Sequence, residues 1–182
     1  SDVCSSDLAA FTGYRGIGRD ITADVRAQRL DRLERRILQL TIENAPLADV
    51  LSELVSGIEQ IAESGLIGSI LLADESGSQL TLGAGPHLPA AYNAAIDGVR
   101  IGPQGGSCGT ACYRGERVIV TDIETDPLWT DFRTLALEHG LRACWSEPVR
   151  GRSARVLGTF ALYYREPRQP LAGELILIEE AG

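Results

Sequence analysis

The sequence predicts an α+β fold in which a single antiparallel sheet has helices on both faces. Short apolar and β-branched runs, which are typical of strands, are separated by turns rich in Gly and Asp. Segments with apolar residues at helical spacing stand before, between and after these runs. The chain has 182 residues, of which 44% are hydrophobic, and this is enough for one ordinary domain with a buried core and an extension.

Composition excludes several classes of function. The formal net charge is −8 and the arginines are scattered, so we expect no contact with nucleic acid or with an anionic membrane surface. No apolar run approaches the roughly 18 residues of a spanning helix, and no signal-peptide pattern opens the chain, so we expect a soluble, cytoplasmic fragment. The four cysteines are irregularly spaced, which favours reduced thiols and gives no metal-binding pattern.

Two short stretches come before the first expected helix. Residues 1–8, which include Cys4, resemble a translated sequencing adapter and are expected to take no part in the fold. Residues 9–22 resemble the last strand of a truncated PAS domain, which hands over to a helix at its end. Asp20 or Thr22 would cap that helix by accepting hydrogen bonds from its first free amides. A generic helix cap explains the same residues equally well.

Residues 23–43 are expected to form a long, charged signalling helix or linker. Its apolar residues Leu30, Leu33, Ile37 and Leu40 follow one another at three- and four-residue spacing, which makes a narrow stripe. Such a stripe favours the seam of a parallel two-stranded coiled coil, and therefore a homodimer. The alternative is that the stripe packs on its own domain, because so short a stripe does not specify a coiled coil.

Residues 44–101 are expected to contain a helix, a hairpin, a short helix and a short strand. Asn44 suits an N-cap and Pro46 a first helical position, so the helix restarts there. Ile67–Ala73 is almost continuously apolar, which indicates a strand buried on both faces. The other elements expected here are the helix Leu47–Ile61, the turn Asp74–Gly77, the strand Gln79–Gly83, the helix Leu88–Ala95 and the strand Val99–Ile101.

Residues 105–146 are rich in Gly, Cys, Asp and Trp, which suggests that they line a cavity. Gly105 and Gly106 precede a helix that Ser107 caps and Gly115 ends, and the free amides at such a start attract an anion or a carbonyl oxygen. A tight turn that only packs this helix on the sheet is the alternative. The elements expected from here on are the helices Cys108–Arg114 and Trp129–His139, the strands Arg117–Thr121, Arg142–Val149 and Val156–Arg165, and a closing helix from Leu171.

Three features of this stretch are candidates for a site. Cys108 lies beside the helix start, where a thiolate is stabilised, although a free cysteine is more often a small buried hydrophobe. Trp129, Phe132 and Trp145 offer a flat apolar surface for a ligand, with core packing as the alternative. The acidic loop 122–126 is expected to shape a turn and to cap the next helix.

Five strings in the second part of the chain carry a family resemblance: GSCGTACYRGE (106–116), VIVTDI (118–123), DPLW (126–129), HGLRACWS (139–146) and VLGTFALYY (156–164). Together they resemble a bacterial GAF sensor domain. The resemblance implies a PAS-related GAF fold over residues 44–182, truncated in its last helix, with the helix after Gly106 as one wall of a ligand cavity. The residues expected to line this pocket are Ser107, Cys108, Thr110, Ala111, Trp129, Phe132, Cys144 and Trp145.

The same resemblance implies a non-catalytic sensory role in a bacterial signalling protein. A small ligand or a redox change in the pocket would shift the terminal helices, which act on an output domain, a histidine kinase or a cyclic-di-GMP enzyme, missing from this fragment. The residues specify neither the ligand nor a cofactor. Two alternatives stay open. One is a thiol enzyme like the GAF-fold free methionine sulfoxide reductases, which have a similar string around their cysteine, and the other is a purely structural dimerisation module.

Overall fold

Six strands form one antiparallel sheet in the spatial order β3-β2-β1-β6-β5-β4. In this computed structural model the described residues are 21–62, 65–152, 155–170 and 174, with side chains described from residue 25. The strands are β1 (Ile67–Ala73), β2 (Gln79–Ala84), β3 (Val99–Arg100), β4 (Val118–Val120), β5 (Ala143–Arg150) and β6 (Val156–Tyr164). Most residues of β1, β5 and β6 are buried, because both faces of the sheet are covered.

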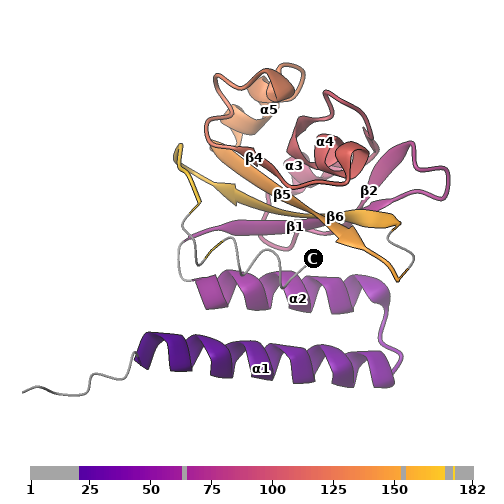
Figure 1. Ribbon diagram of the computed structural model, residues 1–182, viewed down its shortest axis with the longest axis vertical. Helices are drawn as coiled ribbons and strands as arrows, with labels where there is room; N and C mark the ends of the chain where they lie inside the picture. The colour runs from indigo at the N-terminus through magenta and orange to yellow at the C-terminus, as the bar shows by residue number, and fades with distance from the viewer. Residues whose placement is uncertain (1–20, 63–64, 153–154, 171–173, 175–182) are drawn as a thin grey trace, which may run out of the picture.

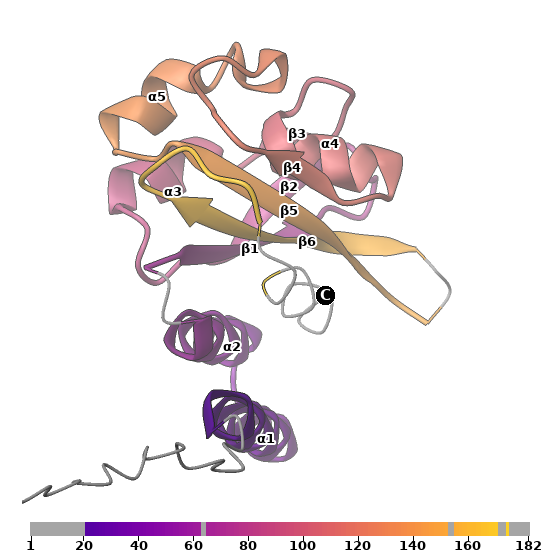
Figure 2. The same cartoon turned by 60° about the vertical axis from the view of Figure 1, so that its left-hand side comes forward.

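Helices cover the two faces of the sheet, as Figure 1 and Figure 2 show. On one face lie α1 (Ile21–Ile42) and α2 (Leu47–Ala62), with α2 between α1 and the sheet. On the other face lie α3 (Ala90–Ile96), α4 (Gly106–Arg114), the 3-10 helix η1 (Pro127–Trp129) and α5 (Arg133–Glu138). The expected α+β class, with helices on both sides of an antiparallel sheet, is thus confirmed.

Two apolar clusters fill the spaces between the sheet and its helices. The upper layer, which includes Leu71, Tyr92, Cys108, Trp129 and Tyr163, lies between the sheet and α3, α4 and α5. The lower layer, which includes Leu33, Val55, Ile58, Trp145 and Phe160, lies between the sheet and the pair α1 and α2. Successive residues of β1, β5 and β6 therefore contribute to different layers.

Asp74 organises the turn between β1 and β2. Its carboxylate accepts hydrogen bonds from the Ser76 hydroxyl at 2.8 Å and from the backbone N–H groups of Ser78 at 2.8 Å and Gln79 at 3.3 Å. The pKa of Asp74 is lowered to about 2, chiefly by the Ser76 hydrogen bond. The expected turn at these residues is confirmed.

The first helix, α1, ends at Ile42, and Asn44 just after it adopts a left-handed conformation with φ 54°. The N–H of Ala45 donates to the Leu40 carbonyl at 3.0 Å and that of Asn44 to the Thr41 carbonyl at 3.2 Å, the pattern of a Schellman motif. The expectation that Asn44 caps α2 is therefore wrong, because Asn44 closes α1. The Pro46 carbonyl accepts the first hydrogen bonds of α2 instead.

The apolar stripe of α1 packs on α2 of the same chain. Leu33 is 7% exposed, and Leu30 and Ile37 are half-buried against the lower layer. A Cβ placed on Gly57 would lie 2.4 Å from Leu33 Cδ1, so the glycine makes room for this leucine. Leu40 is half-buried as well. The stripe thus packs on its own domain, which was the alternative to a coiled coil. Pairing of the stripe with a second chain stays a prediction.

The helix expected from Trp129 to His139 is divided in two. The Asp126 carboxylate accepts a hydrogen bond from the Leu128 N–H at 2.8 Å, and Pro127 follows it, so these residues start a short 3-10 turn. This turn ends at Thr130, and α5 begins only at Arg133. The expected capping role of the acidic loop is confirmed, whereas the single long helix is wrong.

Several expectations lie outside the described residues. These are the adapter segment 1–8, the PAS strand as far as residue 20, and capping by Asp20 or by the Thr22 side chain. Of the closing helix expected from Leu171, only Glu174 is described.

Candidate functional site

Glycines let α4 lie directly against β3. Gly106 has φ 62°, a left-handed conformation that favours glycine, and stands at the start of the helix. A Cβ placed on Gly109 would lie 2.4 Å from the Arg100 carbonyl oxygen, so a larger residue would push the helix away. Gly115, with φ 63°, ends α4 as the sequence predicts.

Ser107 ties α4 to two other elements. Its hydroxyl donates to the Cys144 carbonyl on β5 at 3.2 Å and accepts from the Trp129 indole Nε1–H at 3.0 Å. The expectation that Ser107 caps α4 is wrong, because Gly105 occupies the N-cap position and no side chain caps the helix. The serine instead satisfies the indole N–H of a buried tryptophan.

A small cavity lies beside the start of α4. The residues around it include Tyr92, Ser107, Cys108, Trp129, Phe132 and Tyr163. The space open to a water-sized sphere is about 20 Å³, which corresponds to about one water molecule. A small space thus lies beside α4, and the surrounding side chains fill most of the interior; its use as a ligand pocket stays a prediction.

Thiols and hydroxyls surround Cys108 in the upper layer. The Cys108 Sγ lies 3.2 Å from the Ser146 Oγ and 3.9 Å from the Tyr163 hydroxyl. The Cys144 Sγ lies 3.8 Å from the same Ser146 Oγ. In the part of the chain that the structure describes, three buried hydroxyls near these strands and α4 have no hydrogen-bond partner, those of Ser69, Thr110 and Thr159.

The two thiols differ in acidity. The pKa of Cys108 is lowered to about 7, chiefly by the neighbouring Cys144 thiol and further by the Ser146 hydroxyl, although burial opposes the shift. Burial raises the pKa of Cys144 well above its usual value, and the nearby Cys108 adds to the shift. Burial also raises the pKa of Tyr163, so its hydroxyl stays protonated and can donate. Cys108 is thus the more acidic thiol of the pair.

Four of the expected pocket residues line the cavity: Ser107, Cys108, Trp129 and Phe132. Thr110, Ala111 and Cys144 are fully buried near it without lining it.

Trp145 lies on the opposite face of the sheet, so its assignment to the pocket is wrong. The reason is strand alternation: Cys144 belongs to the upper layer and Trp145 to the lower one. Ser146, on the same face as Cys144, was missed, although its position two residues further along the strand indicates it. Tyr163 was missed because it meets Cys144 only through the register of β5 and β6.

Arg168 covers two aromatic rings beneath the sheet, Trp145 of β5 and Tyr164 of β6. Its guanidinium lies 4.4 Å from the centre of the Tyr164 ring and 5.6 Å from that of Trp145. It also forms an ion pair with Glu174 at 2.9 Å, and Glu174 is 8% exposed. The backbone N–H of Arg168 donates to the Thr121 carbonyl at 3.0 Å. The segment after β6 is thereby fixed to the lower face of the sheet.

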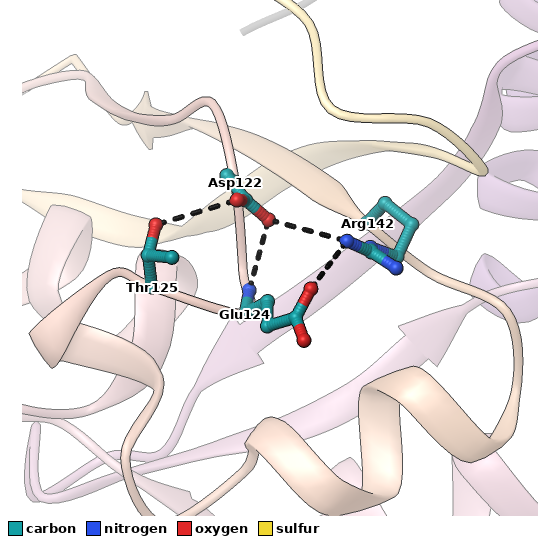
Figure 3. Close-up of polar contacts among 4 residues, drawn as sticks. All are labelled: Asp122, Glu124, Thr125 and Arg142. Carbon is teal, nitrogen blue, oxygen red and sulfur yellow. Dashed lines mark hydrogen bonds and ion pairs between the residues drawn. The ribbon is translucent and has the colours of Figure 1, made fainter.

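Arg142 neutralises the acidic loop that follows β4, as Figure 3 shows. Its guanidinium lies 2.6 Å from Glu124 and 3.8 Å from Asp122. Asp122 also accepts hydrogen bonds from the Glu124 N–H at 3.1 Å and the Thr125 hydroxyl at 3.4 Å. These carboxylates stabilise the conformation of the loop, which agrees with the turn-shaping role expected from the sequence.

Neither a metal site nor a membrane span is found among the described residues. No group of three or more His, Cys, Asp and Glu side chains there is placed to hold a metal ion. No helix of the described chain combines the length and the apolar character needed to cross a membrane.

An antiparallel sheet with helices on both faces and a short helix over a small buried cavity is an α+β domain architecture. A family model described as the GAF domain matches residues 44–182, and the chain belongs to this family. The methyl sulfide methyltransferase-associated sensor of Methanosarcina acetivorans is 38% identical over 173 residues. The match covers 95% of this chain and 17% of that sensor, so the chain spans a small part of its relative.

Solved structures share the fold. The free methionine-R-sulfoxide reductase of Neisseria meningitidis, solved with its substrate, has a TM-score of 0.65 and 18% identity, covering 93% of this chain and 90% of that one. The GAF domain of an Acinetobacter phosphoenolpyruvate-protein phosphotransferase has a TM-score of 0.58 and 23% identity, covering 85% and 89%. At these identities the likeness concerns the fold alone.

Proposed function

We propose that this chain is the non-catalytic sensory domain of a larger signalling protein, and that its input site is the cavity beside α4. The observation that carries the proposal is the position of Cys108, an acidified thiol, on the wall of a small cavity in a GAF fold. The relatedness to a protein named as a sensor supports it. The input is a small ligand or a redox change.

The size of the cavity limits that input. About 20 Å³ accommodates roughly one water molecule, so a larger ligand enters only if Trp129 or Phe132 moves. Phe132 is the candidate gate, because it is only half-buried, whereas Trp129 is held by its hydrogen bond to Ser107. These constraints favour a diatomic or similarly small molecule, or chemistry on the thiol, over a bulky cofactor.

Transmission to the output would proceed through the sheet to α2 and α1. The upper and lower layers share the strands β1, β5 and β6, and α2 packs on the lower face. We propose that these helices pair across a two-fold axis in a cytoplasmic homodimer and act on a histidine kinase or a cyclic-di-GMP enzyme elsewhere in the full protein.

Filling the cavity tests this function. Val99 lines the cavity, and Val99→Leu adds one methylene to it. We expect this variant to mimic occupancy and to change amide hydrogen exchange in α1 and α2, while the control Ile119→Leu, at a side chain that is 39% exposed, leaves it unchanged. Native mass spectrometry of the purified protein would identify a retained small molecule. Unchanged exchange in α1 and α2 for Val99→Leu would contradict transmission.

The structural resemblance to free methionine-R-sulfoxide reductase keeps a thiol enzyme as a second candidate. The buried thiols near the cavity favour it. It requires that the protein consume a thiol reductant when methionine sulfoxide is added, and that Cys108→Ser abolish this. The absence of turnover by the unaltered protein would exclude it.

The nearly filled cavity is the observation that favours a purely structural dimerisation module. Such a module would respond to no small molecule. An exchange response of α1 and α2 to Val99→Leu would therefore argue against this alternative.

A further inference from the structure

The layer beneath α4 brings together two free thiols that are far apart in sequence. Cys108 lies on α4 and Cys144 on β5, and both are unpaired in the structure. Both approach the Ser146 Oγ, at 3.2 Å and 3.8 Å, so the two thiols flank one buried hydroxyl. Neither thiol is an isolated cysteine buried only as a hydrophobe.

We propose that Cys108 and Cys144 form a redox pair that hydrogen peroxide converts into an intramolecular disulfide. The proposal deepens the proposed function by naming the chemistry of its input, and only its signalling consequence rests on that function. The disulfide would join α4 to β5 and so connect the wall of the cavity to the sheet.

The oxidant can reach Cys108 through the cavity. Cys108 lines the cavity and keeps 6% of its surface exposed, whereas Cys144 is fully buried. Space for about one water molecule suits hydrogen peroxide, which is little larger than water, and excludes bulky organic hydroperoxides. Cys108 is therefore the thiol that reacts first.

The environment divides the roles of the two thiols. The lowered pKa of Cys108 raises its thiolate fraction relative to that of Cys144, and thiolates are the reactive form. The raised pKa of Cys144 keeps it protonated until its partner has been oxidised. Ser146 and Tyr163 place hydroxyl groups at 3.2 Å and 3.9 Å from the Cys108 Sγ, where they can stabilise a thiolate.

The chemistry takes two steps. The Cys108 thiolate attacks one peroxide oxygen, an S–O bond forms, the O–O bond breaks, and the departing hydroxide takes up a proton to become water. The Cys144 sulfur then attacks the sulfenic sulfur, the S–S bond forms, the S–O bond breaks, and the Cys144 proton leaves with the hydroxide as a second water. Two thiols lose two electrons in total, and one peroxide is reduced to two waters.

Cys112 is the competing partner, and helix geometry disfavours it. It stands one turn after Cys108 on α4, where Cβ atoms are about 5–6 Å apart, whereas a disulfide needs about 3.5–4.5 Å. Burial raises the pKa of Cys112, which makes it the less reactive thiol. A link between these two cysteines would require α4 to unwind.

Peptide mapping of the peroxide-treated chain tests the pair. Trypsin cleaves after Arg100, Arg114, Arg142 and Arg150, so Cys144 is released in the peptide 143–150 and Cys108 in the peptide 101–114. We expect these two peptides to be linked, with the protein lighter by two hydrogen atoms, and the link to persist in Cys112→Ser. Cys108→Ser should abolish the link.

A second variant keeps the test decisive. Cys144→Ser should stop the reaction at the Cys108 sulfenic acid. Dimedone, added together with denaturant so that it can reach this buried group, traps it as an added mass on peptide 101–114. Absence of the linked peptides from the parent, or a link within peptide 101–114 or between two chains, would overturn the proposal. Circular dichroism of each variant checks that it is folded.

Hydrogen exchange of the oxidised protein separates this proposal from the proposed function. If the disulfide forms and exchange in α1 and α2 stays unchanged, the redox pair stands and transmission fails. If Val99→Leu changes that exchange while peroxide gives no link, transmission stands and the redox pair fails.

Discussion

Leu33→Ala tests whether α1 is held by α2 of the same chain. Leu33 is 7% exposed, and its Cδ1 occupies space that a side chain on Gly57 would need, since a Cβ there would lie only 2.4 Å away. Leu38 provides the matched control, because it is the same residue type on the same helix and is 61% exposed.

The expected loss of unfolding free energy depends on how far neighbouring side chains can fill the space that Leu33→Ala leaves. Removing a buried leucine side chain costs about 2–5 kcal/mol of unfolding free energy, with the cost rising with the cavity that remains. Leu33 is enclosed by α2 on one side only, so neighbouring side chains can close part of the gap, and we expect about 2 kcal/mol. Leu38→Ala removes little packing and should cost less than about 0.5 kcal/mol.

Urea denaturation of the parent and both variants, followed by circular dichroism, measures these differences. Each titration is repeated at two protein concentrations, because a midpoint that depends on concentration reports an interface between chains. Equal losses for Leu33→Ala and Leu38→Ala would refute the packing described. A concentration dependence that disappears only in Leu33→Ala would assign the stripe to the predicted dimer seam instead.

Three further predictions concern α4, the lower layer and the hairpin turn. Gly109→Ala should lower the unfolding free energy by about 1–2 kcal/mol, because its Cβ would meet a carbonyl oxygen of β3, while Gly102→Ala, with open space around it, should change it by less than about 0.5 kcal/mol. Arg168→Ala should cost about 2 kcal/mol and shift tryptophan fluorescence, since it removes the cation above two aromatic rings and leaves the carboxylate of Glu174 buried; an unshifted spectrum would argue against the stacking. Asp74 has a folded-state pKa of about 2, below its unfolded value of about 3.9, so its stabilisation is complete above pH 4 and lost as the pH falls through about 2. Asp74→Asn should flatten this acid limb of the urea midpoint, and an identical pH profile would contradict the assignment.

The sequence predicts the elements well because their signals are local. Apolar runs and turn residues specify β1 and β2, and glycine marks the end of α4. The wrong assignment of Trp145 to the pocket has a different cause. The sequence does not show which alternate residues of β5 face α4. In the run Cys144-Trp145-Ser146 all three residues are compatible with burial on either face of the sheet. Only the pairing with the neighbouring strands determines which of them face α4.

The site is less predictable than the fold. The approach of Cys108 and Cys144 to the same Ser146 hydroxyl depends on how α4 packs over β5, which no local sequence pattern encodes. The stripe at Leu33 is equally compatible with a partner helix in the same chain or in another, because both would bury the same apolar surface. The size of the cavity depends on how closely the side chains around it pack, and composition carries no information on that.

In the signal transmission that we propose, strand β5 is where a change at the cavity would reach the helices. Cys144 and Ser146 face the thiol site, while Trp145 between them packs on Tyr164 beneath the sheet, with ring centres 4.4 Å apart. Because β5 pairs with β4 on one side and β6 on the other, it resists local bending. A displacement of Cys144 by α4 would therefore move the strand as a whole. The adjacent indole must then move against the guanidinium of Arg168, whose ion pair and backbone hydrogen bond fix it in place. A rigid strand with a reactive group on one face and an aromatic stack on the other can therefore couple the layers without any large rearrangement of the sheet.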